Sequence, residues 1–74
     1  MYEHSKVIEE YLLALYKIDR SGENVKAVTL AKRLETSPPT VHATISRMQR
    51  DGLVKVEKSK ILRLTKDGQK VAED

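Results

Sequence analysis

Hydrophobic residues recur at helical spacing within residues 37–52, whose sequence is SPPTVHATISRMQRDG. Val41, Ile45 and Met48 follow one another at intervals of four and three, so they share one side of a helix. The remaining positions are polar, small or cationic, and they include Thr40, His42, Ala43, Thr44, Arg47 and Arg50. The pattern therefore predicts a helix with one buried side and one polar, partly cationic side.

The two ends of this helix also carry recognisable signals. Ser37 is a predicted N-cap, because a short side-chain oxygen can accept a hydrogen bond from a free first-turn amide. Pro38 and Pro39 fit only near such a start, where the missing N–H costs nothing. Gly52 follows Asp51 and is expected to end the helix, as glycine often does just past a helix.

A second helical pattern is present in residues 5–19, with Ser5 as its predicted N-cap. Residues 20–23, which contain Ser21 and Gly22, break the pattern and predict a loop. The apolar residues of the helix recur at three and four and are Ile8, Tyr11, Leu12, Leu15 and Ile18, widened by Val7 and Tyr16.

The stretch that follows the loop predicts a second, shorter helix. Residues 25–28 fit either a short β-prone segment or the first part of this helix, and both alternatives remain open. Residues 29–34 predict the helix itself, and residues 35–36 form a short connection to Ser37. Two short helices joined in this way are typical of a helix-turn-helix. The predicted buried side of the shorter helix consists of Val28, Leu30, Ala31 and Leu34.

The period changes from helical to alternating after Gly52. Apolar residues then alternate with charged ones in two short runs, which predicts a two-stranded hairpin. Its tip carries Lys58 and Lys60, and no Asn-Gly or Asp-Gly pair fixes the type of turn. The apolar positions are Leu53, Val54 and Val56 in the first run and Ile61, Leu62 and Leu64 in the second.

A last helix is predicted over residues 66–73, with Thr65 as its cap and Gly68 lowering its stability. The order of elements is then helix, helix, helix, strand, strand, helix. We therefore predict a mostly helical α+β fold, a winged helix-turn-helix with three helices, a two-stranded wing and a short C-terminal helix. We expect residues 1–74 to form one such domain.

The composition argues against several classes of protein. The 74 residues contain no Cys, so neither disulfides nor thiolate metal ligands are available. No apolar run approaches the ~18 residues of a membrane span, and the amino-terminal segment does not resemble a signal peptide. We therefore expect a cytoplasmic protein with no membrane partner. The sequence also lacks a Gly-rich phosphate loop and a recognisable pairing of His with a catalytic carboxylate, so we expect no enzyme.

Positive charge is concentrated in the middle of the chain. Residues 29–64 contain eight Lys and Arg against three acidic residues, a net charge of +5, whereas residues 1–28 and 65–74 each sum to −1. A concentrated basic surface is typical of nucleic-acid binding. A solvated face without a partner explains a bias of this size about equally well, so the charge alone does not identify a function.

Residues 29–72, TLAKRLETSPPTVHATISRMQRDGLVKVEKSKILRLTKDGQKVA, resemble the amino-terminal domain of the diphtheria toxin repressor family. The first-helix sequence EEYLLALYKI extends the resemblance over nearly the whole chain. Its most specific part, SPPTVHATISRMQRDGL, is similar to the family pattern S-x-P-T-V-x-x-T-V-x-R-M-x-R-D-G-L. The family consists of iron- and manganese-dependent transcriptional repressors. The resemblance therefore implies sequence-specific binding to a double-stranded DNA operator.

The resemblance also implies roles for individual positions. Family residues that match Ser37, Pro39 and Thr40 lie at the DNA surface, where the proline can contact a thymine methyl group. The resemblance and the polar face together predict DNA contacts at Thr29, Ser37, Pro38, Pro39, Thr40, His42, Ala43, Thr44, Arg47, Arg50, Lys58 and Lys60.

Within this set, phosphates and bases are expected to be contacted by different residues. Family residues matching Thr44, Arg47 and Arg50 face or approach backbone phosphates. Well-known members carry serine and glutamine where this chain has His42 and Ala43, and that glutamine contacts bases. Because Ala43 cannot donate a hydrogen bond, we expect a different operator or less reading by hydrogen bonds.

The metal-binding part of the resemblance is incomplete. Glu10 matches a primary ligand of the family, but Leu13 occupies a second position that is acidic in manganese-responsive members. A single carboxylate cannot hold a divalent cation tightly, so we expect no tightly bound cofactor in this chain alone. Iron or manganese and a homodimer are implied for full-length members, whose other ligands and dimer interface follow the region matched here. We therefore expect an excised DNA-binding domain or a short relative without the metal switch.

Two alternatives to this function remain open. Some winged helices contact proteins rather than DNA, and others belong to regulators that use no metal. Affinity for duplex DNA and its dependence on salt would separate the first alternative from the DNA-binding hypothesis.

Overall fold

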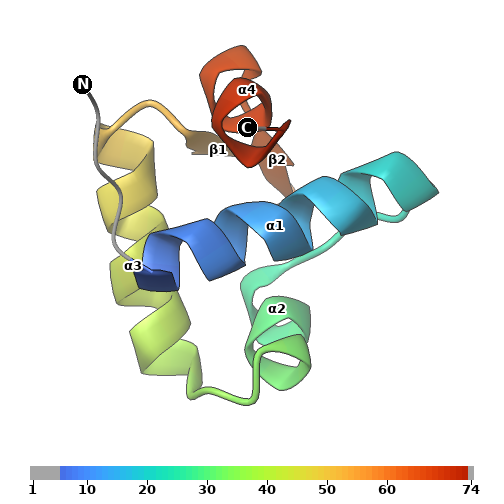
Figure 1. The fold of residues 1–74 in the computed structure, drawn as a ribbon. Helices are drawn as coiled ribbons and strands as arrows, with labels where there is room; N and C mark the ends of the chain where they lie inside the picture. Colours follow the sequence, from blue (N-terminus) through green and yellow to red (C-terminus); the bar gives the residue numbers. More distant parts are fainter. Residues whose placement is uncertain (1–5, 74) are drawn as a thin grey trace.

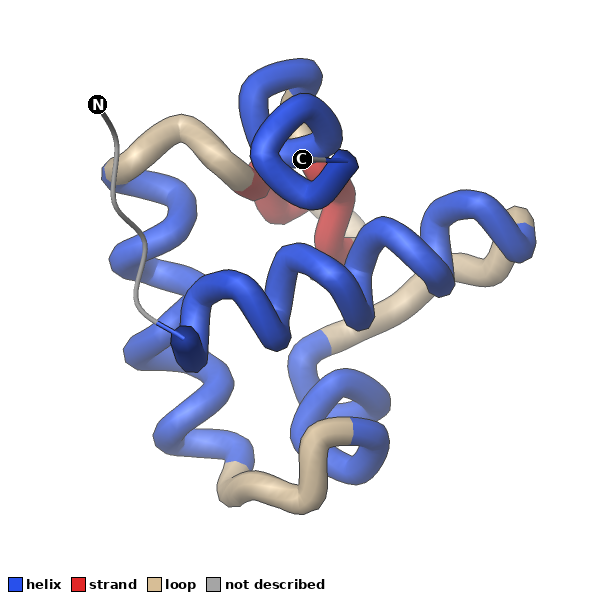
Figure 2. The backbone as a smooth tube through the Cα atoms, viewed as in Figure 1, coloured by secondary structure: helices blue, strands red, loops and turns tan. Residues whose placement is uncertain are grey.

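The computed structural model describes residues 6–73. The chain forms helices and strands in the predicted order: α1 (Lys6–Ser21), α2 (Ala27–Arg33), α3 (Pro38–Arg50), β1 (Val54–Val56), β2 (Leu62–Leu64) and α4 (Lys66–Glu73). In Figure 1, α1 crosses the molecule between α4 and α2, and α3 lies along its amino-terminal end. Of the two strands, red in Figure 2, β2 contacts α1 and α4, and β1 contacts α3. The predicted winged helix-turn-helix fold is confirmed.

The core is built from side chains of α1, α2, α3, the two strands and the adjoining loops, and Val71 and Ala72 of α4 pack against it while partly buried. Among residues 6–73, no polar or charged residue is buried. Because the sequence has no Phe or Trp, aliphatic side chains supply most of the buried apolar surface that stabilises the fold. The buried apolar residues are Ile8, Tyr11, Leu12, Leu15, Ile18, Val25, Leu30, Ala31, Val41, Ile45, Met48, Leu53, Val54, Leu62 and Leu64. No helix within residues 6–73 has the length and apolar character needed to cross a bilayer.

Helix α1 is longer than predicted. It runs to Ser21, two residues beyond the expected end, and the Ser21 hydroxyl donates to the carbonyl of Ile18 at 2.6 Å. Gly22, with φ +83°, then ends the helix, as its left-handed backbone requires. The predicted stripe is buried, but Val7 is 50% exposed, because it lies beside α3 at the edge of the core. The predicted N-cap Ser5 lies outside the described residues.

Residues 25–28 fitted either a short β-prone segment or the start of the second helix, and each alternative holds for part of the segment. Val25 forms an isolated antiparallel bridge with Leu62, and α2 begins at Ala27, two residues earlier than predicted. The assignment of Val28 to the buried side was wrong. Ala27, Leu30, Ala31 and Leu34 face inward, whereas Val28 is 55% exposed.

The turn of the helix-turn-helix is made by backbone hydrogen bonds after α2. Glu35 has φ +53°, and its amide donates to the carbonyl of Lys32 at 3.2 Å. The amide of Thr36 donates to Ala31 at 2.9 Å, which completes a Schellman motif with a glutamate in the position usually taken by glycine. This compact turn leads directly to Ser37, the first residue of the α3 cap.

Both predicted ends of α3 are confirmed. The Ser37 side chain accepts from the Thr40 amide at 3.4 Å, with Pro38 and Pro39 in the first turn. Gly52, with φ +75°, and the next residue complete a Schellman motif, in which the Leu53 amide donates to the carbonyl of Met48 at 2.9 Å. Leu53 and Met48 are both buried, so this motif turns the chain from α3 toward the wing.

The wing is an antiparallel hairpin whose turn the sequence left open. Val54 pairs with Leu64, and Val56 pairs with Leu62. The tip spans residues 58–60, closed by a hydrogen bond from the Glu57 amide to Ile61 at 2.9 Å. Lys60, at the end of the tip, has φ +69°, which is the left-handed residue of a three-residue loop. Val56 is 38% exposed, so Val54 is the one buried residue of β1.

Helix α4 begins at the predicted cap. The Thr65 hydroxyl accepts from the Gly68 amide at 3.0 Å and donates to the carbonyl of Gly52 at 2.6 Å. Gly68 is buried against the backbone of Leu53, where a side chain would not fit. Glycine is therefore required here by close packing, in addition to any loss of helix propensity.

Candidate nucleic-acid interface

Helix α3 buries one side and exposes the other, as its sequence pattern predicts. Val41 and Met48 are fully buried and Ile45 is 4% exposed. Of the predicted contact residues on α3, Thr44 is half-buried, and the others are exposed: Pro38, Pro39, Thr40, His42, Ala43, Arg47 and Arg50. A face of this kind can enter a groove of a duplex without disturbing the core.

The amino-terminal turn of α3 is a small polar cluster with two exposed proline rings beside it. The Ser37 and Thr40 hydroxyls lie 2.8 Å apart, and the Thr44 hydroxyl donates to the carbonyl of Thr40 at 2.9 Å. These hydrogen bonds therefore order the first turn of α3. The hydroxyl groups can still form further hydrogen bonds with a ligand. The amino end of a helix also carries partial positive charge, which favours a phosphate nearby.

Arg47 and Arg50 lie on the outer face of α3 and have no ion-pair partner within residues 6–73. Neither forms an ion pair with Asp51 or with any other residue in the range 6–73. Arg47 borders a shallow surface formed with Ala43, Thr44 and the first turn of α1. Within the described part of the chain, both guanidinium groups are therefore available to a polyanion without loss of a salt bridge.

The opposite flank of α3 forms a groove with the wing and with the start of α2. The groove has a volume of about 480 Å³ and brings Lys60 of the wing together with Lys26 and Val28 of the helix-turn-helix. His42 lines the same groove from α3. The wing and the helix-turn-helix therefore form one continuous surface. We call this groove, together with the exposed residues of α3, the α3–wing face.

Three polar or charged residues that line the groove were missed by sequence reasoning. Ser46 and Gln49 lie four and seven positions after His42, so the helical period alone places them on its side of α3. Lys26 had no such signal, because its proximity to Lys60 exists only in the folded chain. Thr29 and Lys58, both predicted contact residues, are exposed but do not line the groove.

Glu10, the predicted metal ligand, lies on a different surface. It borders a depression between α1 and α2 together with Leu13, Ala14, Lys17, Arg33 and Leu34. No group of three or more potential ligand side chains is close enough to hold a metal ion in the described part of the chain. Two cationic neighbours and one carboxylate do not fit a divalent cation, so residues 6–73 do not form a metal centre by themselves.

Solved structures share this fold. The Staphylococcus aureus transcription regulator MepR matches with a TM-score of 0.85 and 25% sequence identity, over 93% of this chain and 51% of its own. The Archaeoglobus fulgidus protein AF1382 matches with a TM-score of 0.85 and 26% identity, over 95% of this chain and 80% of its own. MarR of Escherichia coli, at 20% identity and a TM-score of 0.82, shows the fold alone.

Curated relatives are more similar in sequence. The iron-dependent repressor IdeR of Mycobacterium leprae is 42% identical over 64 residues, and the diphtheria toxin repressor of Corynebacterium diphtheriae is 41% identical over 64 residues. Each match covers 86% of this chain and 28% of the relative, so the chain spans little more than a quarter of their length. The family model for the N-terminal DNA-binding domain of iron-dependent repressors matches residues 3–62. The chain therefore belongs to the iron-dependent repressor family and corresponds to its N-terminal DNA-binding domain.

Proposed function

We propose that residues 1–74 form one domain that binds double-stranded DNA in a sequence-specific manner, as part of a metal-dependent transcriptional repressor. The observation that carries this proposal is the α3–wing face, which places exposed cations around the exposed side of α3. The family and the fold are those of transcription regulators rather than enzymes, which agrees with a binding role.

In the proposed complex, α3 lies in the major groove and the wing follows the adjacent backbone. Arg47, Arg50 and the wing lysines Lys58 and Lys60 neutralise phosphates, which sets the position of the domain on the duplex. The Ser37 and Thr40 hydroxyls support the same contact at the amino end of α3.

Base reading is proposed for a smaller group. The exposed ring of Pro39 is suited to a thymine methyl group, and His42 can hydrogen-bond to a base edge or a phosphate. Ala43 offers an apolar contact and no hydrogen bond. Pro38, Thr29 and Thr44 complete the proposed contact set at the edges of this surface.

The metal response and the dimer are proposed for a longer protein. The relatives named as iron-dependent repressors are more than three times the length of the matched region. We infer that iron or manganese acts through ligands that residues 6–73 do not supply, with Glu10 contributing at most one carboxylate. The 74 residues alone are expected to bind no metal tightly and to bind DNA weakly, as a monomer, in the cytoplasm.

The central experiment is a fluorescence-anisotropy titration of a labelled mixed-sequence duplex between about 50 mM and 200 mM salt. We expect binding that weakens steeply as salt increases. Selection from a randomised duplex pool should then enrich one sequence if the domain reads bases. Indifference to duplex DNA at every salt concentration would contradict the proposal and favour a protein-contact module. If binding is salt-sensitive but the selection enriches no sequence, the domain binds DNA without the proposed sequence specificity.

A further inference from the structure

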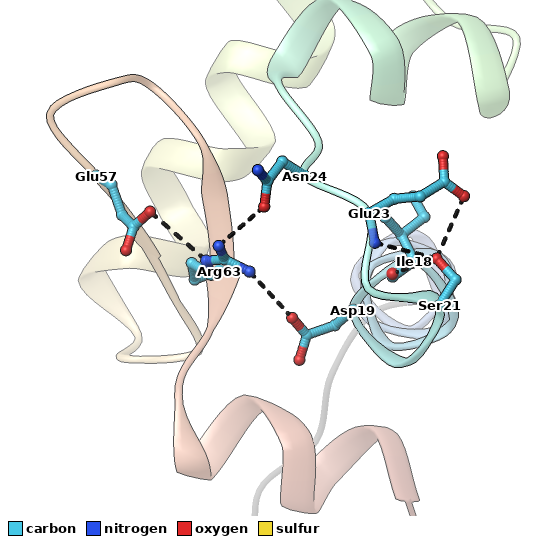
Figure 3. Close-up of polar contacts among 7 residues, drawn as sticks. All are labelled: Ile18, Asp19, Ser21, Glu23, Asn24, Glu57 and Arg63. Atoms are coloured by element: carbon cyan, nitrogen blue, oxygen red, sulfur yellow. Dashed lines mark hydrogen bonds and ion pairs between the residues drawn. The ribbon is translucent and has the colours of Figure 1, made fainter.

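Arg63, in the middle of β2, joins the wing to two other segments of the chain. Its Nη2 donates to Asn24 Oδ1 at 2.9 Å. Its Nη1 lies 3.5 Å from Asp19 Oδ1, and its Nε lies 3.5 Å from Glu57 Oε1. Figure 3 shows the guanidinium between Glu57 of the wing and the pair Asp19 and Asn24. One side chain therefore links the end of α1, the loop before α2 and the wing.

This arrangement removes Arg63 from the cations available to DNA. Each of its three nitrogen atoms faces a protein acceptor, and two of these acceptors are carboxylates. The side chain is 35% exposed, whereas Arg47 and Arg50 on α3 are exposed and have no ion pair in the described range. Arg63 therefore contributes to the net charge of the region, but its charge is already paired with protein carboxylates.

The wing needs such an attachment because it is very short. A two-stranded ribbon with three residues in each strand is not stable alone, so its orientation depends on contacts with the rest of the domain. Leu62 and Leu64 attach one face of β2 to the core, and the Leu62 amide donates to the carbonyl of Val25 at 2.8 Å. Since side chains alternate along a strand, Arg63 fixes the other face.

We propose that Arg63 is a positioning residue, which holds the wing at the angle that lets Lys58 and Lys60 reach DNA together with α3. The inference rests on the proposed DNA-binding function. Partly exposed ion pairs add little to stability, so Arg63 acts on the orientation of the wing more than on the fold as a whole.

The test compares Arg63→Met with Arg33→Met, which makes the same change of side chain and charge on a surface outside the proposed interface. We expect R63M to weaken binding to a mixed-sequence duplex by about tenfold and R33M to weaken it much less. In a K58A/K60A background, R63M should have little further effect, because the wing lysines through which it acts are already gone. Equal losses in both backgrounds would overturn the proposal in favour of a direct phosphate contact.

The conservative variant Arg63→Lys separates geometry from charge. Lysine keeps the positive charge but cannot hold three separated acceptors with one planar group. R63K should therefore remain several-fold weaker than the unchanged protein, and full recovery of affinity would contradict the proposed role.

Hydrogen exchange gives a readout that does not depend on DNA. R63M should accelerate exchange of the Leu62 amide, which bonds to Val25, while the Leu53 amide at the end of α3 stays protected. Unchanged exchange at Leu62 would overturn the attachment itself. If the unchanged protein ignores DNA, the proposed function fails, and the role of Arg63 in DNA binding fails with it. If the unchanged protein binds DNA and R63M binds equally well, only the role of Arg63 is overturned.

Discussion

Gly68 in α4 packs directly against the backbone of Leu53. A Cβ atom placed on Gly68 would overlap the carbonyl oxygen of Leu53 and would lie 3.1 Å from Cδ2 of Leu64. The same carbonyl oxygen accepts from the Thr65 amide at 3.1 Å, so it cannot move away without loss of that hydrogen bond. This contact holds the start of α4 against the segment that joins α3 to the wing.

Gly68→Ala should destabilise the domain, although alanine usually stabilises a helix. We expect the free energy of unfolding to fall by about 2 kcal/mol, because a side chain here must displace backbone atoms. Urea denaturation followed by circular dichroism measures the change. Lys70→Ala, at an exposed position of the same helix, is the control and should change the value by less than about 0.5 kcal/mol. Similar stabilities of the two variants would show that α4 does not pack this closely.

Tyr11 and Tyr16, two tyrosines of α1, should respond oppositely to loss of the hydroxyl group. The Tyr11 hydroxyl is buried and has no hydrogen-bond partner among residues 6–73. The Tyr16 hydroxyl accepts from Arg20 at 3.1 Å and donates to Glu73 at 3.4 Å.

Tyr11→Phe should therefore raise the free energy of unfolding by about 1 kcal/mol, because it removes a buried unpaired polar group. Tyr16→Phe should lower it by about 0.5 kcal/mol, since its hydrogen bonds are exposed. Thermal and urea unfolding of both variants provide the comparison. A loss of stability in Tyr11→Phe would mean that its hydroxyl is paired in solution.

Arg47→Ala should weaken binding to all duplex sequences alike. Loss of one phosphate contact lowers the slope of log K against log salt by about one unit. Titrations at several salt concentrations measure this slope, and Arg33→Ala provides a control with the same loss of charge on the surface near Glu10. An unchanged slope for Arg47→Ala would remove Arg47 from the proposed phosphate contacts.

Ala43→Gln should change which duplex is preferred. Glutamine adds a donor and an acceptor that can pair with adenine in the major groove, at a position where the present side chain makes no hydrogen bond. Selection from a randomised duplex pool should return a different sequence for this variant, while affinity for mixed DNA stays within a few-fold. The same selected sequence from both proteins would argue that residue 43 does not face a base.

The fold followed from local signals wherever those signals were strong. The spacing of Val41, Ile45 and Met48 identified the buried side of α3, and Ser37 and Gly52 marked its two ends, because a cap or a left-handed glycine acts within a few residues. The predictions were weaker at residues 25–28, where Val25 pairs with a strand far along the chain and Ala27 and Val28 begin a helix. A local pattern cannot indicate a partner 37 positions away, such as Leu62 for Val25.

In the candidate site, too, some features follow from local sequence signals and others from contacts between distant residues. Its predicted residues on α3 came from one helical period and one family resemblance, and their proposed contact with DNA stays a prediction. The groove between Lys26 and Lys60, by contrast, exists only because α2 and the wing fold against the same flank of α3. Arg63 counted as one more cation in the sequence, and only its neighbours Asp19 and Glu57 show that its charge is already paired.

The sequence by itself determined the elements, their order, the inward side of α3 and the family. Only the tertiary structure decided which cations are free, why Gly68 cannot carry a side chain, and how the wing is attached. The physical reason is range: helix periods and caps depend on neighbours within one or two turns, whereas charge pairing and close packing depend on residues that meet only after folding.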